Sequence, residues 1–171
     1  MIFGQPYEFA VFYEILEKTE DNYWKYGIFS FFIEDEIYPS KGSNYTLHMA
    51  INYLKDSLQE INSCKSVGLS LSENASELIT QLAHSHGMLL DSDPDDLELP
   101  DSEALGVFLS PIEISDVGFY LFYYPKDNDE ECLIYSSDYG STAKKTTLKK
   151  GTVNNVLQKL PYQEAMLRIM R

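Results

Sequence analysis

The chain has 171 residues, with 27 acidic and 13 basic side chains and a formal net charge of −14 at pH 7. A molecule this acidic repels the phosphate backbone of nucleic acids and the headgroups of anionic lipids, so direct binding to either is disfavoured. The same field attracts a basic partner and raises its rate of encounter, although acidity also serves solubility alone in many proteins.

Length and composition predict one folded domain over residues 1–171. Hydrophobic residues make up 44% of the chain, and 13 Tyr, 9 Phe and 1 Trp supply the bulk of a core. Cys64 and Cys132 lack metal-binding spacing, so we expect reduced thiols. The N-terminus lacks the basic and apolar regions of a secretory signal, and no apolar run reaches the length of a membrane span, so we expect a cytoplasmic protein.

Two aromatic segments near the N-terminus predict a β-hairpin. Residues 7–16 and 23–33 are rich in aromatic and β-branched side chains, and the polar residues 17–22 between them suit a short connection. A brief third strand is expected at residues 37–38. We expect this hairpin to form the centre of the fold.

Helical periodicity follows in the middle of the chain and returns at its end. Apolar residues recur every three or four positions across 44–62 and 73–86, and Ser72 is the expected N-cap of the second helix. The same spacing from Val153 onward predicts a C-terminal helical region, which Pro161 interrupts.

Residues 91–103 form the most acidic window of the chain. They hold seven acidic side chains, two prolines and no basic residue, which favours a solvent-exposed loop. Beyond this loop, residues 118–124 and 131–136 have the pattern of a second hairpin around a polar turn at 126–130. These elements predict an α+β fold in which the two hairpins build an antiparallel sheet packed against several helices.

Charge is unevenly distributed along the chain. From Lys144 onward there are 7 basic and 1 acidic side chains, against 6 and 26 before it. One interpretation is an acidic face reserved for a partner. The other is that the lysines complement acidic neighbours within the fold, as ordinary surface pairs do.

The residues show no catalytic or metal-binding constellation. The close histidine pair, His84 and His86, has no third ligand at a workable spacing, and no HExxH, GxSxG, GxxxxGK or GxGxxG pattern occurs. The acidic window alternates oxygen ligands as a calcium loop does, but it lacks the glycine and the final glutamate of that motif. We therefore expect no enzyme, no catalytic residue, no metal and no cofactor.

The N-terminal pattern has a counterpart in a known family. It consists of Met1-Ile2-Phe3-Gly4, a strand with Phe9 and Glu14, and the spacing of Trp24, Tyr26, Gly27 and Phe29. This opening resembles the bacterial immunity proteins that accompany polymorphic toxins and contact-dependent growth inhibition systems, and it is similar to immunity protein 42. Looser agreement continues at 44–62, 111–116 and 149–152.

The resemblance implies a protein without catalysis of its own that binds and neutralises the C-terminal toxin domain of an effector. Many such toxins are nucleases with basic clefts, so an acidic inhibitor would occlude the active site. Two alternatives remain open. One is an acidic adaptor or chaperone that binds a basic secreted effector without inhibiting it, and the other is a small enzyme that uses scattered carboxylates.

Two acidic segments are the predicted partner-binding residues. The first is the acidic loop, with Asp91, Asp93, Asp95, Asp96, Glu98, Asp101 and Glu103. The second is the tip of the late hairpin, with Asp127, Asp129, Glu130 and Glu131. Exposed tyrosines are expected to add binding energy, with Tyr38, Tyr45 and Tyr139 as examples. Core and turn roles, in which loss costs folding before recognition, are expected for Trp24, Gly27 and Phe29.

Overall fold

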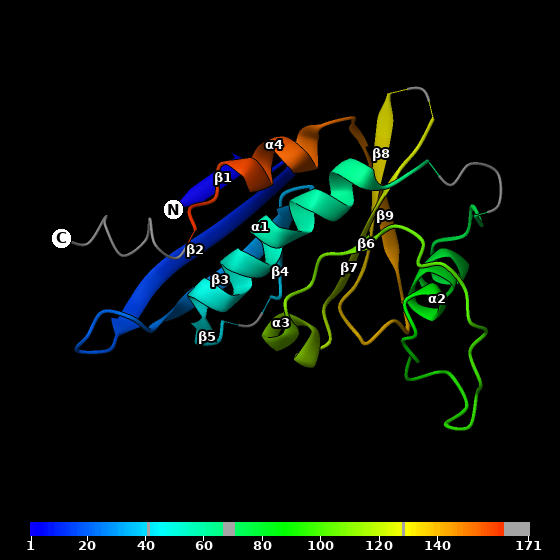
Figure 1. The fold of residues 1–171 in the computed structure, drawn as a ribbon, viewed down its shortest axis with the longest axis horizontal. Coiled ribbons are helices and arrows are strands. Elements are labelled where there is room, and N and C mark those ends of the chain that lie inside the picture. Colours follow the sequence, from blue (N-terminus) through cyan, green and yellow to red (C-terminus); the bar gives the residue numbers. More distant parts are fainter. Residues whose placement is uncertain (41, 67–70, 128, 163–171) are drawn as a thin grey trace. The chain divides into compact units, whose positions relative to one another are not determined.

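The computed structural model describes residues 1–40, 42–66, 71–127 and 129–162, and the chain divides into two compact units (Figure 1). Unit 1 consists of Met1–Gln59, Pro111–Glu113 and Gly151–Arg171. Unit 2 consists of Glu60–Ser110 and Ile114–Lys150. Each unit has its own antiparallel sheet.

The sheet of unit 1 has five strands among the described residues. The strands β1 (Ile2–Gln5), β2 (Phe9–Lys18), β3 (Lys25–Ile33) and β4 (Glu36–Tyr38) follow one another in that order, and β5 (Tyr45–Thr46) also pairs with β3. Neighbouring strands are antiparallel. The predicted N-terminal hairpin is confirmed as β2 and β3, and it lies in the middle of this sheet.

A glycine allows the hairpin to change its register. The pairing of β2 with β3 shifts between Ile15 and Glu17, where β2 holds one extra residue. Gly27 faces this bulge, and a Cβ atom at Gly27 would lie 1.9 Å from the carbonyl oxygen of Glu14. Only glycine therefore fits at this point of the strand.

Helices complete the core of unit 1. The helix α1 (Leu47–Ser63) begins in unit 1 with the predicted spacing of buried residues, and α4 (Thr152–Gln158) lies against β1 and β2. The ammonium group of Lys55 in α1 donates to the carbonyl oxygen of Gln158 at the end of α4, at 2.9 Å. Both predicted helices are thus confirmed, while the predicted continuation from residue 163 lies outside the described residues.

The sheet of unit 2 has four strands among the described residues. These are β6 (Val107–Phe108), β7 (Tyr120–Pro125), β8 (Glu130–Ser136) and β9 (Lys144–Lys149), in that order and antiparallel. The predicted late hairpin is confirmed as β7 and β8. The strand β9 was not predicted, because its lysines obscure the alternation of buried Thr146 and Leu148 with exposed neighbours.

The helix α2 (Ala75–Ser85) covers the sheet of unit 2. Buried Leu78, Ile79 and Leu82 join a core with side chains of β7 and β8, among them Phe122 and Ile134. A short helix, α3 (Ile112–Asp116), connects β6 to β7.

The start of α2 corrects one prediction. Its N-cap is Asn74, whose side-chain oxygen accepts from the backbone N–H of Glu77 at 3.1 Å. The expected cap, Ser72, instead accepts from the N–H of Asn74 through its hydroxyl oxygen. Ser72 thus supports the cap from two residues earlier.

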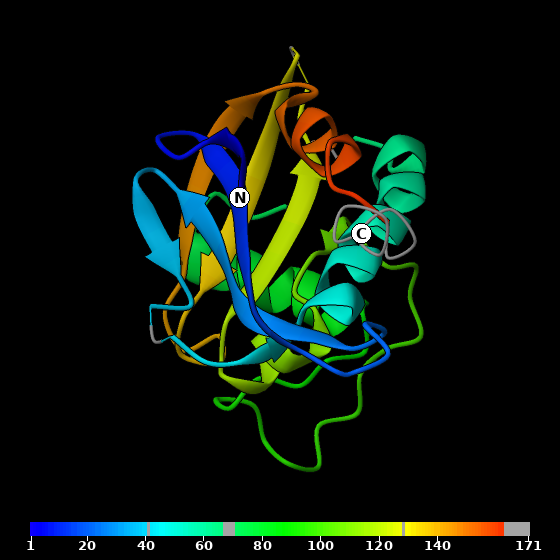
Figure 2. The same ribbon diagram turned by 90° about the vertical axis from the view of Figure 1, so that its left-hand side faces the viewer.

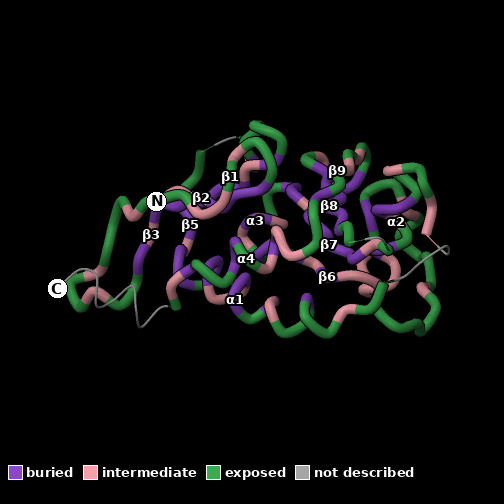
Figure 3. Tube along the Cα trace, turned by 90° about the horizontal axis from the view of Figure 1, so that it is seen from above, coloured by how far each residue is buried: buried purple, intermediate pink, exposed green. Residues whose placement is uncertain are grey.

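The α+β class is confirmed, but the two hairpins lie in separate sheets rather than in one. Each hairpin has local strands at its edges: β1, β4 and β5 in unit 1, and β6 and β9 in unit 2. A hairpin whose edges are already paired has no backbone groups left to extend into a shared sheet. Figure 3 shows the buried residues following the strands, with exposed residues along the connecting segments.

Candidate partner-binding surface

Most of the acidic excess lies in unit 2. Its residues include 16 acidic and 6 basic side chains, whereas those of unit 1 include 11 and 7. All the acidic residues predicted to bind a partner belong to unit 2. This unit therefore exerts the stronger attraction on a basic partner.

The acidic loop, residues 91–103, is tied to α2 at both ends. At its start, the Asp93 carboxylate receives hydrogen bonds from the N–H of Leu90 and from Nε2 of His84, both at 2.7 Å. Just beyond its end, the N–H of Leu105 donates to the hydroxyl of Ser85 at 2.9 Å, and Nε2 of His86 donates to the Leu105 carbonyl at 2.9 Å. The last turn of α2 thus holds the loop in place.

Six of the seven loop carboxylates are exposed to solvent. They are Asp91, Asp95, Asp96, Glu98, Asp101 and Glu103. Asp93 is the exception, because its side chain is only 11% exposed and both its partners lie within unit 2. Burial opposes its ionisation, but the hydrogen bonds from Leu90 and His84 and the charge of His84 together hold the pKa of Asp93 below its usual range. Asp93 therefore fixes the loop, and the other six present charge.

The hairpin tip presents fewer carboxylates than expected. Asp127, Asp129 and Glu130 are exposed, but Glu131 is buried on β8 with an exposed fraction of 1%. The hydroxyl of Tyr123 donates to the Glu131 carboxylate at 3.1 Å. Strand alternation explains the difference, because Glu131 points to the opposite face from Glu130. Glu131 is thus an internal acceptor of unit 2 and not part of its surface.

Lysines lie beside the tip, whereas the loop itself contains none. Glu130 pairs in register with Lys149, and the N–H of Lys150 donates to the carbonyl of Asp129 at 2.8 Å. Lys126 precedes the tip in the chain. These cations offset the carboxylates of the tip, whereas residues 91–103 include no basic side chain at all.

The two acidic segments lie at opposite ends of unit 2. Figures 1 and 2 show the turn between β7 and β8 beyond one end of the strands and the acidic loop beyond the other. The acidic loop, with more exposed carboxylates and no lysine, is the stronger candidate surface.

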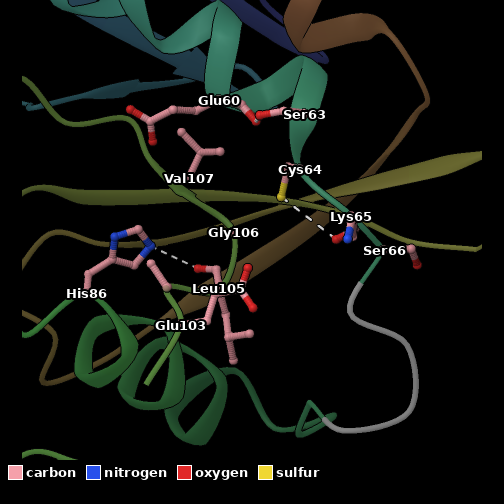
Figure 4. A pocket seen from close by; sticks show the side chains of 11 residues that line it. Glu60, Ser63, Cys64, Lys65, Ser66, His86, Glu103, Leu105, Gly106 and Val107 are labelled. Atoms are coloured by element: carbon pink, nitrogen blue, oxygen red, sulfur yellow. Dashed lines mark hydrogen bonds between the residues drawn. The ribbon is translucent and has the colours of Figure 1, made fainter. Parts of the chain in front are cut away.

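A hollow of about 400 Å³ lies where the acidic loop returns to the sheet of unit 2 (Figure 4). It lies between the end of α1, with Glu60 and the following Cys64, and the segment from Glu103 to Val107. His86 also faces it and is held by its bond to Leu105. The exposed carboxylate of Glu60 thus lies across this hollow from Glu103, the last carboxylate of the loop.

The cysteine and histidine of this hollow are not arranged as a nucleophile and its base. Burial raises the pKa of the Cys64 thiol, with the nearby Glu60 acting in the same direction, so the reactive thiolate is disfavoured. His86 uses Nε2 to donate to a backbone carbonyl. Within the described part of the chain, no three His, Cys, Asp or Glu side chains are grouped to hold a metal ion.

The aromatic predictions are confirmed in part. Tyr139 is exposed, but Tyr38 and Tyr45 are buried, because both strands β4 and β5 turn these side chains into unit 1. Phe29 is in the core, as predicted, whereas Gly27 lies within β3 opposite the bulge and not in a turn. Trp24 was predicted to be in the core, and this is wrong: it is 40% exposed. Its position two residues after the polar segment 17–22 was the signal of exposure.

None of the helices in the described residues has the length and apolar character needed to cross a membrane. With six exposed carboxylates on a loop that is fixed at both ends, the chain is an acidic α+β protein. Comparison with known proteins shows the family to which the chain belongs. The family model of immunity protein 42 matches residues 1–163, and the chain belongs to that family.

Two known proteins show how far the similarity extends. The uncharacterized protein PM0502 of Pasteurella multocida (strain Pm70) is 26% identical over 170 residues, which cover 94% of this chain and 99% of the relative. The crystal structure of CdiI from Burkholderia dolosa AUO158 matches with a TM-score of 0.70 at 20% identity, covering 92% of this chain and 96% of that chain. The resemblance seen in the sequence is thereby confirmed, and the likeness to CdiI shows a shared fold.

Proposed function

We propose that this chain is an immunity protein that binds the C-terminal toxin domain of its cognate effector in the cytoplasm and neutralises it without chemistry of its own. Membership of the immunity protein 42 family supports a role in toxin immunity. Because the family match spans both units, we also propose that residues 1–171 act as one immunity domain.

The acidic loop carries the finer part of the proposal. It holds six exposed carboxylates without a lysine, fixed to α2 at both ends. Such a loop matches a basic cleft of the kind that nucleases use to hold phosphates, and filling the cleft would exclude the substrate. Fixing the loop in advance lowers the entropy lost on binding. We infer a basic, nuclease-type toxin whose active site the loop covers.

Co-expression tests this function. The C-terminal domain encoded directly upstream of this gene is expressed from an inducible promoter, with and without the chain, and survival and co-purification are measured. Survival that depends on the chain, with a stable complex, supports the proposal. A complex without survival identifies an adaptor instead, and continued death without a complex contradicts any immunity role towards that domain.

A further inference from the structure

The turn between β2 and β3 in unit 1 displays two aromatic side chains outside the core. Tyr23 is 49% exposed and Trp24, the single tryptophan of the chain, is 40% exposed. The Trp24 ring lies edge-on to the ring of His48, with centroids 4.7 Å apart, and the Tyr23 ring lies 5.6 Å from that of Trp24. Tyr23, Trp24 and His48 thus form one aromatic cluster on unit 1.

Backbone and side-chain hydrogen bonds hold this cluster in a fixed position. Thr19 and Trp24 are joined twice: the N–H of Thr19 donates to the Trp24 carbonyl at 3.0 Å, and the N–H of Trp24 donates to the Thr19 hydroxyl at 3.1 Å. The Asp21 carboxylate accepts from the N–H of Tyr23 at 3.0 Å. Beneath the turn, buried Lys25 donates to the carbonyl of Asn22 at 2.9 Å.

This fixed geometry has a consequence for binding. A rigid aromatic ring loses little conformational freedom when a partner covers it, so most of the contact energy is kept. Exposed tryptophan and tyrosine side chains are also the residues that contribute most to protein interfaces. A turn held by its own hydrogen bonds does not need a half-exposed tryptophan for its shape.

The surroundings of the cluster select a cationic partner. The exposed charged groups of the turn and of the adjoining end of β2 are three carboxylates and one ammonium group, namely Glu17, Glu20, Asp21 and Lys18. His48 adds no repulsion near neutral pH, because burial and the charge of Lys25 lower the pKa of His48 and only Glu113 opposes them. A guanidinium group can stack on an indole face while it pairs with a nearby carboxylate.

We propose that the aromatic cluster of unit 1 is an anchor for the toxin domain, at which a basic side chain of the toxin, Arg in the first place, stacks on Trp24 and pairs with the carboxylates of the turn. This inference rests on the proposed function and adds a contact that the acidic loop of unit 2 does not provide. The stacked cation supplies the binding energy of a desolvated aromatic contact, which exposed charge pairs lack.

The single tryptophan gives this anchor its own spectroscopic probe. The chain is labelled with 5-fluorotryptophan, which yields one fluorine resonance, and titrated with the purified C-terminal domain encoded directly upstream. We expect that resonance to shift on binding. We also expect acrylamide to quench the fluorescence of Trp24 less as the ring is covered. Trp24→Ala is expected to raise the dissociation constant about tenfold or more, as loss of an interface anchor does.

Tyr7→Ala is the matched control, because Tyr7 is an aromatic residue of unit 1 with an exposed fraction of 60%. It should change the dissociation constant by less than about twofold, as most exposed contacts do. Circular dichroism and thermal unfolding of both variants separate lost contact from lost fold, and Trp24→Phe should restore part of the affinity.

The outcomes separate the anchor from the function. One outcome is that the complex forms, the fluorine signal does not shift, and Trp24→Ala binds as tightly as the unsubstituted chain. This outcome overturns the anchor and leaves the proposed function standing. A shift that appears on concentrating the chain alone assigns the cluster to self-association and also overturns it. Failure of the unsubstituted chain to bind the toxin domain contradicts both.

Discussion

At the residue scale, neighbouring carboxylates within each acidic segment have different roles. Asp93 and Glu131 are enclosed by hydrogen-bond partners, whereas Asp95 and Glu130 face solvent. Sequence alone separates them poorly, because charge counts and turn signals are the same for both kinds. Burial and partners decide which carboxylate maintains the fold and which is free to attract a partner.

Asp93→Asn tests the structural carboxylate. Losing the charged acceptor of two hydrogen bonds should lower the free energy of unfolding by about 1–3 kcal/mol at neutral pH. Because the folded pKa of Asp93 is depressed, its contribution is fully present above the unfolded value of about 4 and is lost as the pH falls through the lower folded value. Urea unfolding at several pH values measures this difference, and it should shrink in acid.

The matched control for Asp93 is Asp95→Asn, in the same loop but exposed. Surface substitutions of this kind usually change stability by less than about 0.5 kcal/mol. Equal losses from both variants would show that Asp93 does not hold the loop.

Gly27→Ala tests the close approach at the bulge. The added methyl carbon would lie 1.9 Å from the Glu14 carbonyl oxygen, so the strands must separate. We expect a loss of more than about 2 kcal/mol, as for other backbone clashes in a core. Thermal unfolding measures it against Gly42→Ala, where no atom lies within 4 Å of the new Cβ. A melting temperature equal to that control would rule out the bulge geometry.

At the scale of elements, alternation and helical spacing were sufficient to predict both hairpins and α1, α2 and α4. What they missed was obscured by the lysines of β9 and by the hydrogen-bonded turn that holds Trp24. The strand β9 is stabilised by pairing with β8, and its lysines obscure the alternation of Thr146 and Leu148 in the sequence. Trp24 was assigned to the core because large aromatic residues usually are buried, whereas its turn holds it outwards.

Asn74→Ala tests the start of α2, to which the acidic loop is tied. Removing the side-chain acceptor of the N-cap should lower the free energy of unfolding by about 1 kcal/mol. Ser76→Ala, an exposed position in the first turn, is the control and should have little effect. Urea unfolding of both variants is the measurement, and a full loss in Ser76→Ala alone would place the cap elsewhere.

At the scale of the whole molecule, charge and family agree. A net charge of −14 and a match to the immunity protein 42 family both indicate a protein that acts on a partner by binding it. The sequence predicted the acidic loop but could not rank it above the hairpin tip. The ranking came from lysines of β9 that the fold brings to the tip, which are far from the tip in sequence.

The dissociation constant of the toxin complex, compared between two triple variants, tests whether the acidic loop binds the toxin. Asp95→Asn, Asp96→Asn and Glu98→Gln remove three charges from the loop. Asp127→Asn, Asp129→Asn and Glu130→Gln remove three from the tip. We predict that the loop variant weakens binding about tenfold or more at about 50 mM salt and far less at about 500 mM, while the tip variant changes it little. Equal effects of the two variants, or a stronger effect of the tip variant, would contradict the acidic loop as the toxin-binding surface.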